Sequence, residues 1–332
     1  MEKIKLYLPD SLIQLIDSDC VAFDIHKPNG DINRNQFLND LLQHYFYAYR
    51  DARQSQLDAL QAVLHDAAPM PASVELSAAA RCLEVISQRT VGYSGIAKPV
   101  SLKPTKRTDP IIRYVTSDAL GGVSISAYLR DMLASYAALP QSERETVLFA
   151  NAYETITSAI KNNRKVRFAT RRTPDVVHDV NVYAVAPSRE RLFTYILCEE
   201  DGRLSSYRLS RINLPISLPA ERTFSASDEE KFLRMLTYGP AFAINTLENI
   251  RVRFTEAGLR KYQAIYTNRP DPAEVNGNEM VFQCARDQIV RYLERLGADA
   301  VIISPEDAHQ QAEEYYRAAV EAYEKEGASN AE

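Results

Sequence analysis

The side chains with the clearest chemical potential are bases gathered in the middle of the chain. Residues 161–211 hold eleven Lys and Arg against six Asp and Glu, a net charge of +5, although the whole chain carries −5. An arginine guanidinium is a planar fork that fits phosphate, and a tyrosine ring can stack on a nucleobase. Because the local acids cannot neutralise this excess, the segment is predicted to bind phosphate. The candidate residues are Lys165, Arg167, Arg171, Arg189, Tyr195, Arg203, Arg208 and Arg211.

The spacing of Arg208 and Arg211 gives a geometric prediction within this set. Two residues three apart in a β-strand point to opposite faces, so one could line a site while the other braces it. The competing interpretation is a solvated strand face whose charges pair with Glu199, Glu200 and Asp201. A single arginine fits either interpretation, whereas the excess charge of the whole set favours binding.

A second basic group lies at the start of the chain. Lys3, Lys5 and Tyr7 alternate with three aliphatic residues, which predicts a strand with one basic and one apolar face. A short helix at residues 11–18 and a second helix that opens at residues 33–36 follow this strand. A strand followed by two helices resembles ribbon-helix-helix proteins, whose paired strands enter the DNA major groove. In this interpretation the start of the second helix would bind a phosphate. The competing interpretation is a β-hairpin or an edge strand that merely pairs two copies and presents a solvated face.

The same order of elements returns, more weakly, later in the chain. Residues 100–103 alternate again, and Asp109-Pro110 and Ser124-Ile125-Ser126 each open a helix. This internal repeat predicts that the two half-motifs could pair within one chain. A linker near Ala67–Ala72 and a helix at about 74–89 separate them.

Signals of catalysis and metal binding are absent from the sequence. There is no Walker loop, G-x-G-x-x-G or H-E-x-x-H, and His178-Asp179 lacks a nucleophile in a recognisable turn. The four cysteines are far apart and form no C-x-x-C, which predicts reduced thiols and no zinc. No apolar run approaches the ~18 residues of a membrane span, and the start has no apolar signal region. We therefore expect a cytoplasmic protein that is not an enzyme, without cofactor, metal or membrane contact.

The elements that must position these residues suggest a multidomain α+β chain. We expect an N-terminal ribbon-helix-helix-like domain at 1–140, a β domain at 141–220 and a C-terminal α+β domain at 221–332. A capped helix from Ser142 through Ile156 leads into four short strands between residues 165 and 213. The C-terminal expectation is strand 249–254, helix 256–266, strand 279–284, helix 286–296, strand 299–303 and helix 305–325.

The middle domain resembles a WYL domain, a small Sm/SH3-like barrel. The helix entry at residues 156–161, the Val166-Arg167-Phe168 strand, the Tyr183-Ala184-Val185 strand and the closing Arg208-Leu209-Ser210-Arg211-Ile212 fall in family order. The name-giving tripeptide falls at Thr194-Tyr195-Ile196, where only the tyrosine matches. Thr170 and Val182 also depart from the family, which usually has an aromatic residue and a proline there.

Residues 249–325 resemble the C-terminal extension that follows WYL domains, for which we expect a ferredoxin-like fold. The passage Gly297-Ala298-Asp299-Ala300-Val301-Ile302-Ile303-Ser304-Pro305 fits that pattern. The domain order as a whole resembles the WYL-domain accessory proteins of type VI-D CRISPR systems. The resemblance implies single-stranded RNA binding by the barrel, enhancement of a partner RNA-guided ribonuclease, and a homodimer built by the C-terminal domain.

Two other classes of function stay open. A transcriptional regulator would bind DNA through the ribbon and sense a ligand with the WYL domain. A scaffold would dock its basic patch on an acidic protein, and it would lack the steep salt dependence that counterion release gives to nucleic-acid binding.

Overall fold

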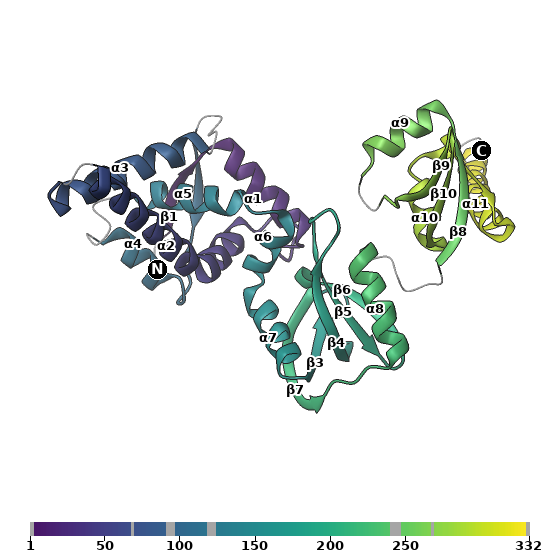
Figure 1. The fold of residues 1–332 in the computed structure, drawn as a ribbon, viewed down its shortest axis with the longest axis horizontal. Helices are drawn as coiled ribbons and strands as arrows, with labels where there is room; N and C mark the ends of the chain where they lie inside the picture. The colour runs from purple at the N-terminus through teal and green to yellow at the C-terminus, as the bar shows by residue number, and fades with distance from the viewer. Residues whose placement is uncertain are drawn as a thin grey trace. The chain divides into compact units, whose positions relative to one another are not determined.

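The computed structural model describes residues 3–67, 70–90, 97–117, 124–239, 247–266 and 269–329 (Figure 1). The chain divides into two compact units. The first comprises Met1–Ser158, Phe168–Val177 and Arg208–Ile216, and the second comprises Ala159–Arg167, His178–Tyr207 and Ser217–Glu332. Helices and antiparallel sheets alternate along the chain, which confirms the α+β class. In these ranges, no helix is both long enough and apolar enough to span a bilayer.

A two-stranded antiparallel ribbon lies in the first unit. Strand β1 (Ile4–Leu8) pairs with β2 (Lys98–Leu102), and Leu6 lies opposite Val100. Leu6, Leu8, Val100 and Leu102 are buried, so the alternate residues project outward. The prediction that two half-motifs pair within one chain is therefore confirmed.

Helices follow each strand of the ribbon. The first half continues into α1 (Asp10–Ala22) and α2 (Arg34–Ala67), and the second half continues into α4 (Asp109–Thr116) and α5 (Ile125–Ala137). Helix α3 (Ala72–Thr90) packs along α2 between the halves. Helix α1 runs four residues beyond the predicted end, and α2 is far longer than the apolar stripe that predicted it. The predicted helix break at Gly121-Gly122 lies outside the described residues.

The helix expected from Ser142 through Ile156 is two helices. Helix α6 (Gln141–Leu148) ends at Phe149, whose φ of −108° and ψ of 33° leave the helical region, and α7 (Ala150–Lys161) follows. Helices α1, α5 and α6 meet at Asp19, which is completely buried. Its carboxylate accepts hydrogen bonds from Arg144 at 2.8 and 2.9 Å and from the Tyr136 hydroxyl at 2.8 Å. These bonds compensate the cost of burying the charge, so the three helices are tied in one arrangement.

Five strands form the sheet of the middle region. They are β3 (Arg164–Thr170), β4 (Val177–Pro187), β5 (Thr194–Glu200), β6 (Arg203–Arg208) and β7 (Ile212–Glu221), in the order β6-β5-β4-β3-β7. The prediction of four strands missed β7, because its Pro215 and Pro219 suggested the end of the β region. Proline is tolerated in an edge strand, and β7 is an edge of this sheet.

Helix α8 (Ala226–Tyr238) packs on this sheet and was not predicted (Figure 1). The Ser225 hydroxyl accepts a hydrogen bond from the Asp228 N–H, and the Asp228 carboxylate accepts one from the Ser225 N–H. The two bonds form a capping box. Phe232 and Met235 are fully buried against Leu197 and Leu204. The Tyr183 ring stacks on Phe232 with centroids 4.6 Å apart. One face of the sheet is therefore partly covered.

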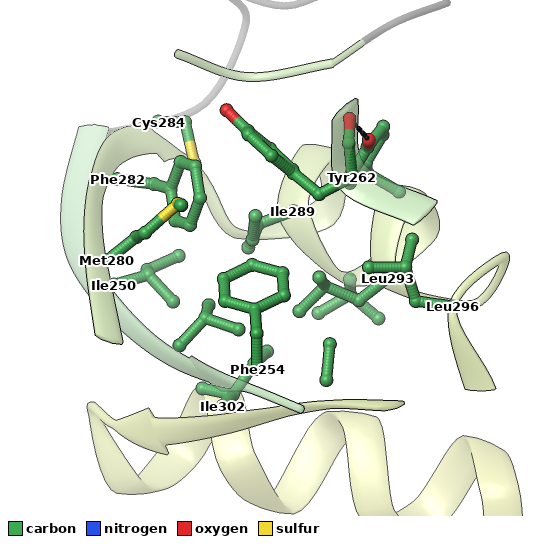
Figure 2. Close-up of a cluster of buried hydrophobic side chains, with 14 of the residues drawn as sticks. Ile250, Phe254, Tyr262, Met280, Phe282, Cys284, Ile289, Leu293, Leu296 and Ile302 are labelled. Carbon is green, nitrogen blue, oxygen red and sulfur yellow. Dashed lines mark hydrogen bonds between the residues drawn. The ribbon is translucent and has the colours of Figure 1, made fainter. Parts of the chain in front are cut away.

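The C-terminal region is a four-stranded antiparallel sheet with helices. Phe254 lies at the centre of its core, with Ile250, Ile289, Leu293 and Ile302 around it (Figure 2). The strand order is β11-β8-β10-β9. The elements are β8 (Leu247–Phe254), α9 (Glu256–Ala264), β9 (Pro272–Asn276), β10 (Glu279–Ala285), α10 (Arg286–Leu293), β11 (Ala300–Ser304) and α11 (Glu306–Ser329). All six predicted elements are present, and β9 is additional.

Candidate nucleic-acid interface

On β3, two of the predicted bases project from the side of the sheet opposite its buried residues. Lys165 and Arg167 alternate with Val166 and Phe168, which are buried. The Arg167 guanidinium donates two hydrogen bonds of 2.5 Å to the Asp179 carboxylate. This bonding lowers the pKa of Asp179. Both partners are exposed, so solvent screens their attraction and the pair contributes little to stability.

The other candidates of the second unit are spread over β5, β6 and a turn. Tyr195 is half-buried in β5 opposite Ala186, and it shares a strand face with Leu197, against which α8 packs. Arg203 is exposed at the first residue of β6. Arg189 lies in the turn between β4 and β5. These residues therefore do not form one compact cluster with Lys165.

The prediction that Arg208 and Arg211 point to opposite strand faces is wrong. The strand ends at Arg208, and residues Leu209–Arg211 tighten into a 3₁₀ turn. Side chains three residues apart eclipse one another in such a turn. Arg208 Nη2 donates to the Ala22 carbonyl at 2.6 Å, and Arg211 Nε lies 3.7 Å from the Asp24 carboxylate. Both arginines therefore reach the same turn at the end of α1, whose terminal carbonyls favour a cation.

Arg171 reaches that turn as well. It follows the last residue of β3, and its backbone N–H donates to the Arg211 carbonyl at 2.8 Å. Its guanidinium lies over the Phe149 ring at 5.0 Å and contacts the Asp24 carbonyl at 3.5 Å. Arg171, Arg208 and Arg211, hereafter the arginine cluster, thus hold a protein turn. These contacts within the protein explain the positions of the three side chains without a bound ligand. RNA binding by the arginine cluster stays a prediction.

The ribbon presents an exposed basic surface in the first unit. Lys3, Lys5 and Tyr7 are exposed, as predicted, and Lys5 lies opposite Ser101 on β2. Continuing the register by one residue places Lys3 opposite Lys103. Within the described ranges, no carboxylate pairs with Lys3, Lys5 or Lys103, whereas Lys98 on the same ribbon lies 2.9 Å from Asp10. This face therefore offers positive charge that the fold leaves unneutralised.

The helix start beside the ribbon is capped by its own side chains. Asn33 Oδ1 accepts from the Gln36 N–H at 3.1 Å, and Asn33 Nδ2 donates to Gln36 Oε1 at 3.2 Å. The predicted cap is therefore confirmed, while a phosphate at this helix start stays a prediction. Sequence reasoning placed Lys103 outward on the second strand but did not select it as a site residue, and it did not consider Lys106 or Arg107; all three are exposed at and after the end of β2. The alternation of Lys103 with Leu102 was the available signal.

His178 and Asp179 do not act together. Adjacent strand residues point to opposite faces, so Asp179 meets Arg167 while His178 meets Glu200, with Nδ1 3.0 Å from Oε2. The Tyr207 hydroxyl lies 3.3 Å from the same nitrogen, and burial raises the pKa of Tyr207 to about 12. Among the residues that the structure describes, no three His, Cys, Asp or Glu side chains form a candidate metal site.

Together these features define a multidomain α+β protein with two exposed basic surfaces, one on a ribbon and one on β3. A similar fold occurs in a solved structure described as a CRISPR Cas-related protein, with a TM-score of 0.67 and 18% sequence identity over 98% of this chain and 95% of that chain. Proteasome accessory factor B/C (PafBC) of Arthrobacter aurescens matches at 16% identity over 68% of this chain and 37% of that one. Its TM-score of 0.25 is too low to indicate a shared fold. No protein-family model and no curated protein matches the sequence.

Proposed function

We propose that this chain is a non-catalytic accessory protein of a CRISPR system that binds single-stranded RNA. The observation that carries RNA binding is the outward side of β3, where the exposed Arg167 and the half-buried Lys165 outnumber Asp179. The fold shared with a CRISPR Cas-related protein supports the CRISPR assignment. Unpaired RNA is bound by backbone charge and by stacking; Lys165 and Arg167 can supply the charge, and the half-buried Tyr195 offers a ring for stacking.

The finer assignments follow from the resemblance in the sequence. The strand order, with a 3₁₀ turn leading from β6 to β7 at the opposite edge, supports an Sm-like barrel of the WYL type. The C-terminal β-α-β-β-α-β order supports a ferredoxin-like extension. The proposed partners are the RNA-guided ribonuclease of a type VI-D system, whose cleavage the protein would enhance in the cytoplasm, and a second copy of the chain.

A transcriptional regulator that binds duplex DNA is the second candidate. The ribbon favours it, because a two-stranded ribbon with lysines on its outer face fits the shape and charge of a major groove. In this candidate the barrel would sense a ligand, and RNA affinity would be low.

Fluorescence anisotropy with a labelled single-stranded RNA and a duplex DNA of equal length tests the proposal across several salt concentrations. We expect tighter RNA binding, with an affinity that falls steeply with salt as counterions are released. The double variant Lys165→Ala/Arg167→Ala should lower the salt slope for RNA by roughly one to two, because it removes the two proposed phosphate contacts on this side of β3.

Arg234→Ala is the matched control, because Arg234 is exposed on α8 of the same unit and pairs with Glu230. It should leave RNA binding unchanged. An unchanged RNA slope in the double variant would contradict RNA binding on this sheet, and a preference of the parent chain for duplex DNA would favour the second candidate. A cleavage assay with the partner ribonuclease then tests enhancement.

A further inference from the structure

The two strands of the ribbon are anchored in matching ways. The Tyr7 N–H donates to Ser126 Oγ at 3.3 Å, and the Lys103 N–H donates to Asn35 Oδ1 at 2.7 Å. Ser126 is the second residue of α5, and Asn35 is the second residue of α2. Each strand is therefore tied to the second helix of the other half-motif. One chain thus builds, by an approximate internal two-fold relation, a complete ribbon that otherwise needs two chains.

The outer faces of the two strands are nevertheless unequal. Lys3, Lys5 and Lys103 lie toward one end of the ribbon, whereas the other end has Tyr7 opposite Pro99. A ribbon made by two identical chains would carry the same side chains at both ends. The outer face of this ribbon therefore carries lysines at one end and Tyr7 with Pro99 at the other, where Lys98 is paired with Asp10.

The charged end also has a fixed backbone. Asn39 is buried, and its amide donates to the Lys103 carbonyl at 3.1 Å while its Oδ1 accepts from the Thr105 N–H at 3.1 Å and from the Thr108 hydroxyl at 2.5 Å. These bonds hold the turn that presents Lys106 and Arg107 beyond Lys103, and both side chains are exposed. Cations on a rigid backbone bind phosphate without a large ordering cost.

We propose that one copy of this chain binds an asymmetric duplex DNA element in a single orientation, with Lys103, just after β2, contacting the duplex together with Lys3 and Lys5 at the start of β1. A five-residue strand is about 17 Å long, which spans about five base pairs at 3.4 Å each. The charged end lies along phosphates, and the Tyr7 end meets apolar base edges such as thymine methyl groups. The inference rests on one part of the second candidate function, the binding of duplex DNA by the ribbon, and it uses no residue of β3.

Selection from a library of random 20-base-pair duplexes by the full chain tests the asymmetry. The expected motif per ribbon is an element of about five base pairs that is not self-complementary. If two chains bind together, two such elements appear, and each is still asymmetric. An enriched element that is itself palindromic would overturn the inference, because a symmetric ribbon reads a symmetric site.

Two lysine variants and one matched control test the contacts on the selected duplex. Lys5→Ala and Lys103→Ala should each lower the salt slope by about 0.9, the value for one phosphate contact on duplex DNA. Lys98→Ala should leave it unchanged, because Lys98 pairs with Asp10, the first residue of α1.

The outcomes separate the two levels of proposal. A lower salt slope for the duplex in Lys5→Ala, with an unchanged slope in Lys103→Ala, overturns the two-stranded site alone. Unchanged duplex binding in both variants, or a loss of RNA binding in place of duplex binding, overturns the ribbon as a DNA site and with it the second candidate function.

Discussion

Asp40 on α2 is a carboxyl group held partly out of water beside the arginine cluster. Burial raises its pKa to about 6, although a hydrogen bond from Gln36 and the charge of Arg171 act in the opposite direction. An unperturbed aspartate has a pKa of about 3.9. The folded chain therefore holds a proton on Asp40 over a range of pH in which the unfolded chain has released it.

This difference predicts how stability depends on pH. Between about pH 4 and pH 6 the folded state binds more protons than the unfolded state, so Asp40 makes the free energy of unfolding fall as the pH rises. Asp40→Asn should flatten that part of the profile and stabilise the chain near pH 7. Urea unfolding at several pH values measures both effects. The exposed Asp31→Asn is the control, and identical profiles for the parent chain and Asp40→Asn would refute the assignment.

At the scale of single residues, the sequence predicts side-chain chemistry better than side-chain partners. The outward position of Lys3, Lys5 and Tyr7 follows from alternation alone, and the structure confirms it. Arg208 and Arg211 were misplaced because alternation holds only while the strand continues, and the chain turns at Leu209. Their carbonyl and carboxylate partners come from α1 and its following turn, almost two hundred residues away in sequence.

At the scale of elements, Phe232 is the side chain that fixes α8 to the sheet. Phe232→Ala should destabilise the second unit by about 3–5 kcal/mol, because it removes a fully buried ring and leaves a cavity beside Tyr183. Leu233→Ala is the matched control, since the neighbouring Leu233 side chain is 55% exposed and its loss should cost little. Urea unfolding followed by circular dichroism measures the two free energies, and equal values would contradict the proposed packing.

The elements that sequence reasoning missed share a physical cause. Strand β7 contains two prolines, which argue against a strand unless the strand is known to lie at an edge. Helix α8 had a readable start in Ser225 and Asp228, but two prolines shortly before it obscured the transition. Strand β9 is short and polar, and only the Asn276-Gly277 turn before β10 indicated a hairpin. In contrast, the predicted C-terminal elements had strong periodicity and clear caps.

At the scale of the whole molecule, charge and apolar surface are divided among different regions. The basic surfaces are on the ribbon and on β3, whereas α11 carries an exposed apolar side. Val320 and Tyr323 of this helix are 55% and 81% exposed. Near its start, a mainly apolar pocket of about 370 Å³ is lined by Val301, Ala312 and Tyr315 among others. Exposed apolar surface of this kind is typical of a protein–protein contact.

We expect this surface to join two copies of the chain, as the resemblance of the C-terminal region implies. Sedimentation velocity at micromolar concentration should show a dimer, and Val320→Asp/Tyr323→Asp should shift it to monomer by placing charges in an apolar contact. Arg317→Ala on the same helix, where Arg317 pairs with Glu313, is the control and should remain a dimer. Because α11 is distinct from β3 and the ribbon, the monomeric variant should keep the salt slope for nucleic acid measured per chain. A parent chain that stays monomeric at this concentration would exclude the dimer, and a slope that falls with dissociation would show that the binding surface needs both copies.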